Sequence, residues 1–363
     1  MPDKLGVGMI SYAHVHAQFR SRALCEIPEV SIKAIADDNE ARGRAAASEY
    51  GAPYYYSDYR SLLDRKDIGL VFIHSETNRH AEIAIAAAEA GKHVFCEKPM
   101  TTSMRDARRI MDAVRRTGVR FTMGFCSRFM PEAERAKEIV DSGVLGDITM
   151  ARAIIGLAGV AEIGCPPDMV EWMLDPERSG GGAFIDEGSH GIDLLRWLMG
   201  DIESISAFVS KTVRKDLPLE DTATAILRFK NGAIGELSTS WNLNIDIRMR
   251  NVIELYGSLG TMLIELTTPL PAVKVYTRES LPATLAGWVN PYIIPQEVEP
   301  HNYLSWPTHV QHYRNEVRDV IWRFLDGREF RVKGEDGYAA LEAILAGYVS
   351  AREGKEIKLP LMD

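Results

Sequence analysis

The stretch Glu97-Lys98-Pro99 directly follows the β-prone run 93–96. Its lysine ammonium is a candidate group for stabilising negative charge that develops in a reaction. A lysine at the carboxyl end of a parallel strand lies at the edge where open α/β sheets bind ligands. The proline fixes its own φ and restricts Lys98 to extended backbone, so the chain does not continue into a helix there. We therefore expect Lys98 to face a ligand site. The alternative is a strand-end turn with a solvated Glu-Lys pair.

A second candidate is the Asp186/His190 pair, which follows three consecutive glycines at 180–182. Glycines allow another part of the protein to approach the backbone closely. Residues four apart share one face of a helix. A carboxylate within reach of an imidazole fixes its tautomer and raises its basicity, which suits a general base near neutral pH. The alternative is a surface contact or a helix cap.

The N-terminal stretch is a variant of the dinucleotide fingerprint, G-x-G-x-x-S, with Gly6, Gly8 and Ser11 at the three positions. The first glycine would permit a tight turn, the second would let the backbone approach a pyrophosphate, and the following helix N-terminus would supply N–H groups. Asp37 ends a second apolar strand, where a carboxylate can accept hydrogen bonds from the adenine ribose and repel a 2′-phosphate. This favours NAD over NADP. Alternatively, Asp37 only caps the next helix.

The elements around these residues alternate between short apolar strands and helices, which predicts a parallel, doubly wound sheet. The expected strands are 5–10, 30–36, 53–56, 68–73, 93–96 and 120–124, and the expected helices are 15–25, 40–50, 59–65, 81–90 and 103–117. The last strand ends near residue 124. We expect residues 1–124 to form a nucleotide-binding Rossmann domain.

After residue 125 the pattern changes to hydrophobic alternation of period two, with turn pairs such as Asn231-Gly232. The expected strands are 148–155, 202–209, 222–229, 233–241, 252–256 and 261–266, and the expected helices are 133–142, 186–198, 311–325 and 338–351. We expect residues 125–363 to form an α+β domain with a large, mostly antiparallel sheet. Ligand sites favour the junction of two such domains.

Composition narrows the classes of partner. A chain of 363 residues is too long for one core, and its charge of −9 argues against nucleic acid and against an anionic membrane. No charged-then-apolar leader opens the chain, and no apolar run approaches the ~18 residues of a membrane span. We expect a cytoplasmic protein that binds a small molecule.

Metal and disulfide chemistry are not indicated. The four cysteines show neither C-x-x-C nor paired spacing. A metal-dependent lyase would need ligands such as His309 and His312, or His14 and His16, but each pair lacks a second cluster at metal spacing. We expect no metal.

The three motifs, in this order along nearly the whole chain, resemble those of the Gfo/Idh/MocA oxidoreductases, the family of glucose-fructose oxidoreductase and inositol dehydrogenase. The motifs that carry the resemblance are the stretch 6–14, Asp37, 97–99, the run G-F-C-S-R-F-M-P at 124–131, and the stretch 180–193. The resemblance implies a Rossmann domain and a mixed-sheet domain whose open face forms dimers or tetramers. It also implies that Lys98, Asp186 and His190 are catalytic, and that the Lys98–Pro99 bond is cis.

The resemblance also implies further contacts. Arg128 and Trp172 lie where similar proteins line the nicotinamide end of the cofactor. The expected NAD contacts are Gly6, Gly8, Ser11, Tyr12, Ala13, His14, Asp37, Ser75, Thr77, Asn78, His80, Glu97, Lys98, Arg128 and Trp172. The expected substrate contacts are Lys98, Arg128, Trp172, Asp186, His190 and His309.

Some residues depart from the family pattern. Ser11 replaces the third glycine, Glu76 stands where the family turn usually has proline, and Cys126 stands where asparagine is common. The long irregular segments 156–177 and 288–306 are either sources of substrate specificity or oligomer arms.

The resulting prediction is reversible hydride transfer between NAD and a secondary alcohol of a sugar, glycoside or cyclic polyol. Two other functions stay open. One is an NAD-dependent glycoside-cleaving enzyme that oxidises its substrate transiently and retains the cofactor. The other is a non-enzymatic, dinucleotide-sensing regulator, for which a retained base would have no use.

Overall fold

The computed structural model describes residues 4–244, 249–267, 272–277, 289–293 and 307–361. The chain divides into two compact units. The first unit comprises Met1–Cys126, Cys165–Gly180 and Tyr313–Leu341, and the second comprises Ser127–Gly164, Gly181–His312 and Glu342–Asp363. These are not the two contiguous segments 1–124 and 125–363 expected from the sequence, because two later stretches pack with the N-terminal one.

The first unit is built on a six-stranded parallel sheet of order β3-β2-β1-β4-β5-β6. This is the strand order of a dinucleotide-binding Rossmann fold. The strands are β1 (Leu5–Ile10), β2 (Val30–Ala36), β3 (Tyr54–Tyr56), β4 (Leu70–Ile73), β5 (His93–Cys96) and β6 (Phe121–Met123). The prediction of a doubly wound parallel sheet is confirmed.

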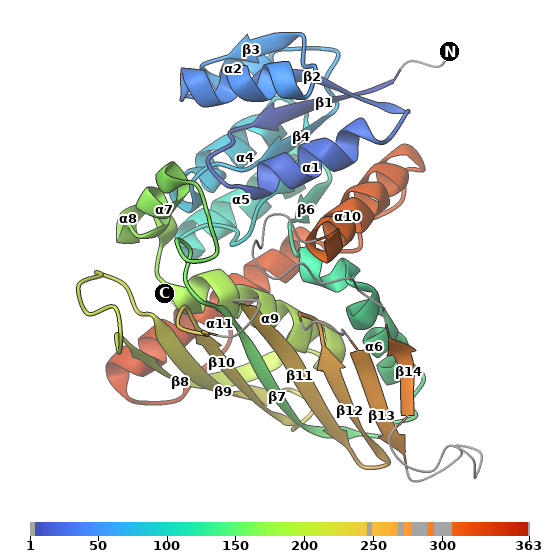
Figure 1. The fold of residues 1–363 in the computed structure, drawn as a ribbon, viewed down its shortest axis with the longest axis vertical. Helices are drawn as coiled ribbons and strands as arrows, with labels where there is room; N and C mark the ends of the chain where they lie inside the picture. Colours follow the sequence, from blue (N-terminus) through green and yellow to red (C-terminus); the bar gives the residue numbers. More distant parts are fainter. Residues whose placement is uncertain (1–3, 245–248, 268–271, 278–288, 294–306, 362–363) are drawn as a thin grey trace. The chain divides into compact units, whose positions relative to one another are not determined.

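Helices connect these strands (Figure 1). They are α1 (His16–Cys25), α2 (Glu40–Glu49), α3 (Tyr59–Leu63), η1 (Thr77–Arg79), α4 (His80–Glu89) and α5 (Met104–Thr117). Local signals set their ends: the Asn39 side chain caps α2, the Ser103 side chain caps α5, and Gly118 ends α5 with φ 70°. Two later helices, α7 (Pro167–Met173) and α8 (Pro176–Ser179), belong to this unit as well.

The second unit is built on a sheet of nine strands among the described residues, ordered β14-β13-β12-β11-β7-β10-β9-β8-β15. The β7–β10 pair is parallel and the other described pairs are antiparallel. The strands are β7 (Ile148–Leu157), β8 (Ile202–Ser210), β9 (Thr222–Phe229), β10 (Ile234–Ser240), β11 (Met249–Gly257), β12 (Gly260–Glu265), β13 (Ala272–Thr277), β14 (Val289–Ile293) and β15 (Ile357–Lys358). The predicted mostly antiparallel sheet is confirmed, whereas β13, β14 and β15 were not expected.

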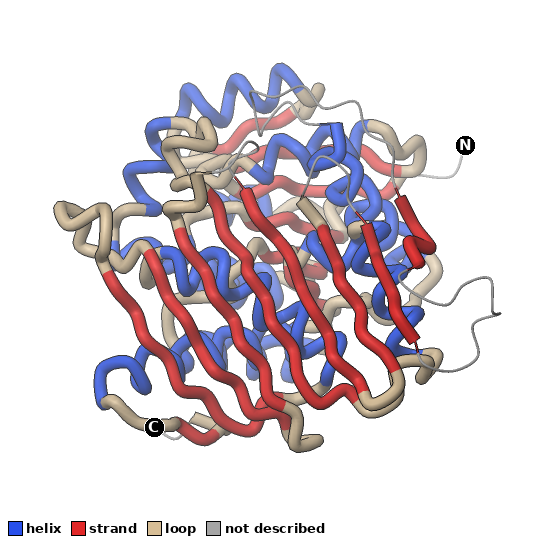
Figure 2. The backbone as a smooth tube through the Cα atoms, turned by 60° about the horizontal axis from the view of Figure 1, so that its bottom comes forward, coloured by secondary structure: helices blue, strands red, loops and turns tan. Residues whose placement is uncertain are grey.

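One face of this sheet is covered by α9 (Ala183–Met199), which packs across β7, β9 and β10 (Figure 1). Figure 2 looks onto the opposite face, where the strands lie in front of the helices. The side chains that alternate outward there include Met150, Ile154, Phe208, Ile226 and Ile234, all of them exposed.

The remaining helices are η2 (Cys126–Phe129), α6 (Pro131–Asp141), α10 (Pro307–Leu325) and α11 (Gly334–Glu353). In the described part of the chain, no helix combines the length and the apolar character needed to cross a bilayer.

Candidate active site

Gly6 and Gly8 do not form the phosphate-binding turn that the fingerprint predicted, because both lie inside β1. A Cβ on Gly6 would lie 1.7 Å from the carbonyl oxygen of Asp67, and one on Gly8 would lie 2.6 Å from a methyl of Leu62. These glycines are therefore required for packing of the strand. Their contact with the cofactor stays a prediction.

The turn that follows β1 is Ser11–Val15, and α1 begins directly after it. Ser11 has φ 66° and is the one non-glycine residue of positive φ in the described chain. It therefore takes the backbone conformation that glycine usually provides. Its Oγ accepts the N–H of Ala13 at 3.1 Å. The predicted contacts of Ser11, Ala13 and His14 fit this turn, since it lies at the carboxyl end of β1.

Tyr12 turns the other way. Its hydroxyl is 2.7 Å from the hydroxyl of Ser21, its ring stacks on Tyr50, and it belongs to the apolar core of the first unit. The ring therefore supports the turn from inside, and the cofactor contact of Tyr12 stays a prediction.

Asp37 is buried just after β2, and its carboxylate accepts four hydrogen bonds. The N–H of Tyr12 donates at 2.7 Å and the N–H of Asn39 at 2.9 Å, while Arg42 donates through Nε at 3.0 Å and through Nη2 at 2.8 Å. Since Asn39 is the N-cap of α2, Asp37 is not merely a helix cap. Its carboxylate ties the end of β2 to the Ser11–Val15 turn, where a dinucleotide places its ribose.

Helix α7 makes three contacts with the same edge of the sheet. Trp172 Nε1 donates to the carbonyl of Ala13 at 3.1 Å, and Arg42 Nη1 donates to Asp168 at 2.6 Å. Among the described residues, the N–H of Val15 at the start of α1 has one acceptor, the thioether of Met169, at 3.4 Å. A thioether is a weak acceptor, so a phosphate oxygen could replace it. The turn, Asp37 and this donor fit a bound dinucleotide.

The turn after β4 carries Ser75, Thr77, Asn78 and His80. Ser75 and Thr77 are buried, whereas Asn78 is exposed. Both ring nitrogens of His80 lie against backbone carbonyls, Nδ1 at 2.9 Å from Pro99 and Nε2 at 3.1 Å from Ser75. His80 therefore joins this turn to the stretch after Lys98. Both ring nitrogens are occupied in this way, and the cofactor contact of His80 stays a prediction.

Glu97 and Lys98 are both buried, at 0% and 4% exposure, which excludes a solvated Glu-Lys turn. Glu97 forms an ion pair with Arg20, and Arg20 Nε donates to Glu316 at 2.9 Å. The N–H of Lys98 donates to Glu97 Oε1 at 3.0 Å, so the carboxylate also holds the lysine backbone. The cofactor contact of Glu97 stays a prediction. The Lys98–Pro99 bond is cis, as the family resemblance implied.

Burial alone would raise the pKa of Glu97, but the Arg20 guanidinium and His16 hold it well below its usual value. Burial lowers the pKa of His14 well below 6.5 and lowers that of His16. Lys98 therefore stands beside an ionised carboxylate and two neutral imidazoles at neutral pH.

Among the described residues, one group has donor atoms close enough to hold a metal ion, namely His14, His16 and Glu97, within 4.8 Å of one another. Two observations oppose that use. His14 Nδ1 accepts the N–H of His16 at 3.2 Å, which puts the proton of the neutral ring on Nε2. Glu97 is already paired with Arg20. The absence of a metal stays a prediction.

In the second unit, Asp186 and His190 lie four residues apart on α9, each 7% exposed. This burial excludes a surface ion pair. The Oγ of Ser127 lies 3.4 Å from His190 Nδ1, and Trp241 Nε1 donates to Asp186 Oδ2 at 3.0 Å. The pair thus has polar partners from two other elements.

The N-terminus of α9 is held by a remote carboxylate, Glu220, which accepts the N–H of Gly182 at 2.9 Å and of Phe184 at 3.0 Å. The hydroxyl of Tyr348 donates to the same oxygen at 2.7 Å. A Cβ on Gly181 would lie 2.3 Å from that hydroxyl, and one on Gly182 would lie 2.0 Å from the carbonyl of Glu220. The glycine run is therefore needed for this cap, which sets the position of the first turn of α9.

Arg128 forms a buried, two-pronged ion pair with Asp193, from Nε at 2.8 Å and from Nη2 at 2.5 Å. It connects η2 to α9. Its contact with cofactor or substrate stays a prediction, as does that of Trp172. The predicted substrate contact of His309 falls on a side chain outside the described part of the structure.

Lys98 belongs to the first unit, whereas Asp186 and His190 belong to the second. Their joint action on one substrate therefore stays a prediction.

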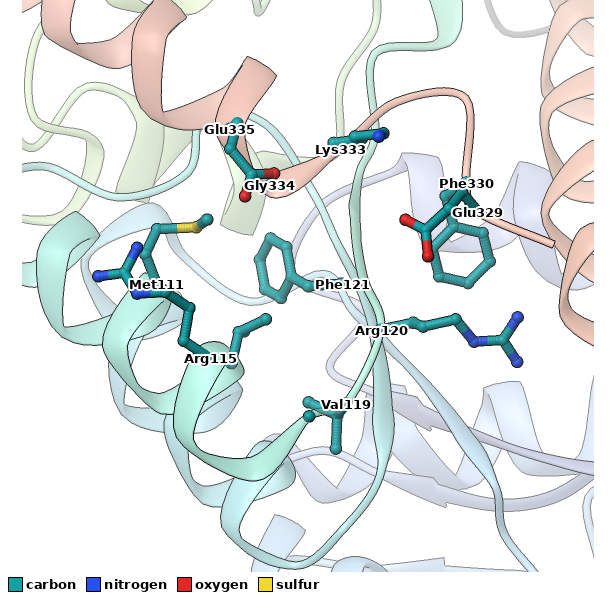
Figure 3. A pocket seen from close by; sticks show the side chains of 12 residues that line it. Met111, Arg115, Val119, Arg120, Phe121, Glu329, Phe330, Lys333, Gly334 and Glu335 are labelled. Atoms are coloured by element: carbon teal, nitrogen blue, oxygen red, sulfur yellow. The ribbon is translucent and has the colours of Figure 1, made fainter. Parts of the chain in front are cut away.

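A cavity of about 230 Å³ in the first unit lies at the opposite end of β6 from the cofactor edge (Figure 3). Phe121, Met111, Val119 and Phe330 line it together with Arg115 and Lys333. Ligands of open α/β sheets bind outside the carboxyl ends of the strands, so this cavity is not the predicted cofactor site.

Sequence reasoning missed Arg20, Glu316, Glu220, Tyr348 and Trp241. Arg20 had a signal, since it lies four residues from His16 and four from Leu24 and so shares their buried helix face. The other four are brought in from elements remote in sequence, and their own local patterns carried no such signal.

Comparison with known proteins gives matches along both units. Residues 5–125 match the description "Oxidoreductase family, NAD-binding Rossmann fold", and residues 133–263 match "GFO/IDH/MocA C-terminal domain". Myo-inositol 2-dehydrogenase of Thermotoga maritima is 28% identical over 98% of this chain and 97% of its own length. Levoglucosan dehydrogenase of Pseudarthrobacter phenanthrenivorans is 30% identical over 63% of this chain and 64% of its own. A solved structure of levoglucosan dehydrogenase with NADH and levoglucosan has a TM-score of 0.86 at 25% identity, covering 99% of this chain and all of that one.

Proposed function

Because the chain belongs to the GFO/IDH/MocA family of NAD-binding oxidoreductases, we propose that it oxidises a secondary hydroxyl of a sugar, glycoside or cyclic polyol and reduces NAD. The observation that carries the proposal is the burial of Lys98, Asp186 and His190, each with polar partners arranged around it. A dinucleotide-sensing regulator has no use for a buried base and a buried ammonium.

In the proposed reaction, His190 takes the proton of the substrate hydroxyl. Asp186 orients the imidazole and stabilises its protonated form, and the Lys98 ammonium stabilises the developing alkoxide. NAD, when bound, accepts the carbinol hydride. The alcohol thereby loses a hydride and a proton and becomes a ketone, or a lactone where the carbon is anomeric.

The test is a screen of polyols, monosaccharides and glycosides for NADH formation by the purified protein, with identification of any co-purified cofactor. We expect NADH to form with at least one cyclic polyol or sugar. No turnover across the panel, with NAD bound, would contradict the proposal.

A second candidate is cleavage of a glycoside with the cofactor retained, which would use the same three residues. The contacts of α7 with Ala13, Val15 and Arg42 favour it, since they cross the edge where the cofactor would leave. Release of an aglycone without added NAD would distinguish this reaction from net oxidation.

The cofactor preference gives a prediction. Asp37→Ala should weaken NAD binding and strengthen NADP binding, because the ribose loses its acceptor and Arg42 becomes available to a 2′-phosphate. The measurement is the ratio of the dissociation constants for NAD and NADP. Asp38→Ala is the matched control, since Asp38 is half exposed and pairs with Arg79. Tighter NADP binding by the unaltered protein would contradict the role of Asp37.

The exposed face of the nine-stranded sheet supports a homodimer or homotetramer, as expected from the family. It carries Phe208 at 80% exposure together with Ile226 and Ile234, and apolar patches of this kind mark association surfaces. We further propose that the protein acts in the cytoplasm.

A further inference from the structure

Trp241 follows β10 and lies 55 residues after Asp186 in the chain, yet its side chain is 1% exposed and reaches Asp186, the carboxylate proposed to orient the base. Its Nε1 donates to Asp186 Oδ2 at 3.0 Å. The indole N–H can only donate, and an ionised carboxylate can only accept. In this contact Trp241 is therefore the donor and Asp186 the acceptor, as an ionised carboxylate requires.

The backbone of Trp241 is itself held in place. Its N–H donates to the carbonyl of Asp221 at 2.8 Å. The fully buried carboxylate of Asp221 accepts the N–H groups of Thr212, Val213 and Arg214 at 3.1, 3.0 and 2.8 Å. Burial would raise the pKa of Asp221, but these backbone donors hold it well below its usual value. The backbone that carries the indole is thus held by hydrogen bonds at the end of β10.

We propose that Trp241 is a positioning residue of the general base, whose N–H fixes one oxygen of Asp186 and limits the negative charge that Asp186 offers to His190. The inference rests on the proposed function. A hydrogen bond to a carboxylate draws charge toward the donor, and the remaining charge stabilises the imidazolium. Trp241 would thereby keep the proton affinity of His190 lower than an unrestrained carboxylate would make it.

Other charged side chains surround the pair. On α9 these are Glu187 and Asp193, with Asp193 paired to Arg128 from η2. Glu220 lies at the N-terminus of α9, bonded to Tyr348. These charges are the same in the presence and absence of the Trp241 N–H, so a change in titration on its removal reports on the Asp186 contact.

The experiment compares pH–rate profiles of the unaltered protein and Trp241→Phe, together with a protein carrying 3-benzothienylalanine at position 241, which has sulfur in place of the N–H. We expect the ionisation that governs oxidation to move up by roughly 0.5 to 1 pH unit in both, since a hydrogen bond to a charged group is worth more than a neutral one. Asp186→Asn should move it down. These opposite directions separate a lost donor from a lost charge.

A ¹⁵N NMR titration of the His190 imidazole, assigned by comparison with His190→Asn, measures the same ionisation without substrate. Trp322→Phe, which removes an exposed indole on α10, is the matched control and should leave the titration unchanged. An unchanged His190 titration in both position-241 variants, or a downward shift, would overturn the inference. Failure of the proposed function shows differently, as absent turnover in the unaltered protein, while the NMR titration still decides the role of Trp241.

Discussion

Replacing His190 by asparagine is expected to lower the rate of substrate oxidation by roughly 100-fold to 10,000-fold, the usual contribution of a positioned general base. The rate of the unaltered protein should rise with pH through one ionisation that belongs to the imidazole and its carboxylate jointly. Asp186→Asn should lower the rate and move that ionisation to lower pH, because a neutral amide no longer stabilises the imidazolium.

The double variant distinguishes a catalytic pair from two independent residues. If Asp186 acts only through His190, the double variant should be little slower than His190→Asn alone. Melting temperatures measured alongside show whether the loss of Asp186 also releases Trp241, its buried partner. Independent, multiplicative losses would mean that the two residues do separate work, and Lys98 would be the next candidate for the base.

Replacing Lys98 by methionine is expected to reduce turnover by ~100-fold or more, by analogy with removal of one oxyanion donor. The expectation depends on the surroundings of the lysine. Glu97 accepts a hydrogen bond from the backbone N–H of Lys98 and is itself paired with Arg20. The backbone from which the Lys98 side chain extends is therefore fixed in position. Methionine keeps the length of the side chain and removes the charge. Turnover is measured at saturating substrate.

Lys98→Arg should not restore the rate, because a planar guanidinium presents its donors in a different geometry and does not release its proton. Lys66→Met, on an exposed residue between α3 and β4, is the control for loss of one positive charge. If Lys98→Met had near-normal turnover and an unchanged melting temperature, the stretch 97–99 would be a structural turn without a catalytic role.

Local patterns were sufficient where the physical cause is local. The bounds of strands such as β2 and β9 were predicted within a residue, because their apolar residues are either continuous or alternate with polar ones. Both ends of α5 were predicted because the capping residues, Ser103 and Gly118, are themselves visible in the sequence. The positions of Lys98 after β5 and of Asp37 after β2 followed for the same reason, since each needs only the end of one strand.

The fingerprint predicted the phosphate-binding turn at the wrong residues, because the spacing of glycines does not show where the strand ends and the turn begins. Gly6 and Gly8 have the spacing of a phosphate turn, but β1 continues to Ile10, and the positive φ falls on Ser11, a residue type that gives no such signal. Whether a glycine serves a turn or a close strand contact depends on what packs against it, here Asp67 and Leu62.

The sequence by itself determined the class of each layer and the family, and it indicated Lys98, Asp186 and His190 as the candidate catalytic residues. Only the tertiary structure decided which side chains hold them. Arg20, itself held by Glu316, pairs with Glu97 next to Lys98, while Trp241, Glu220 and Tyr348 hold the start of α9. The residues joined by these contacts lie from 36 to 296 residues apart in the chain. Because no local periodicity links such segments, their meeting depends on how the sheets and helices pack together.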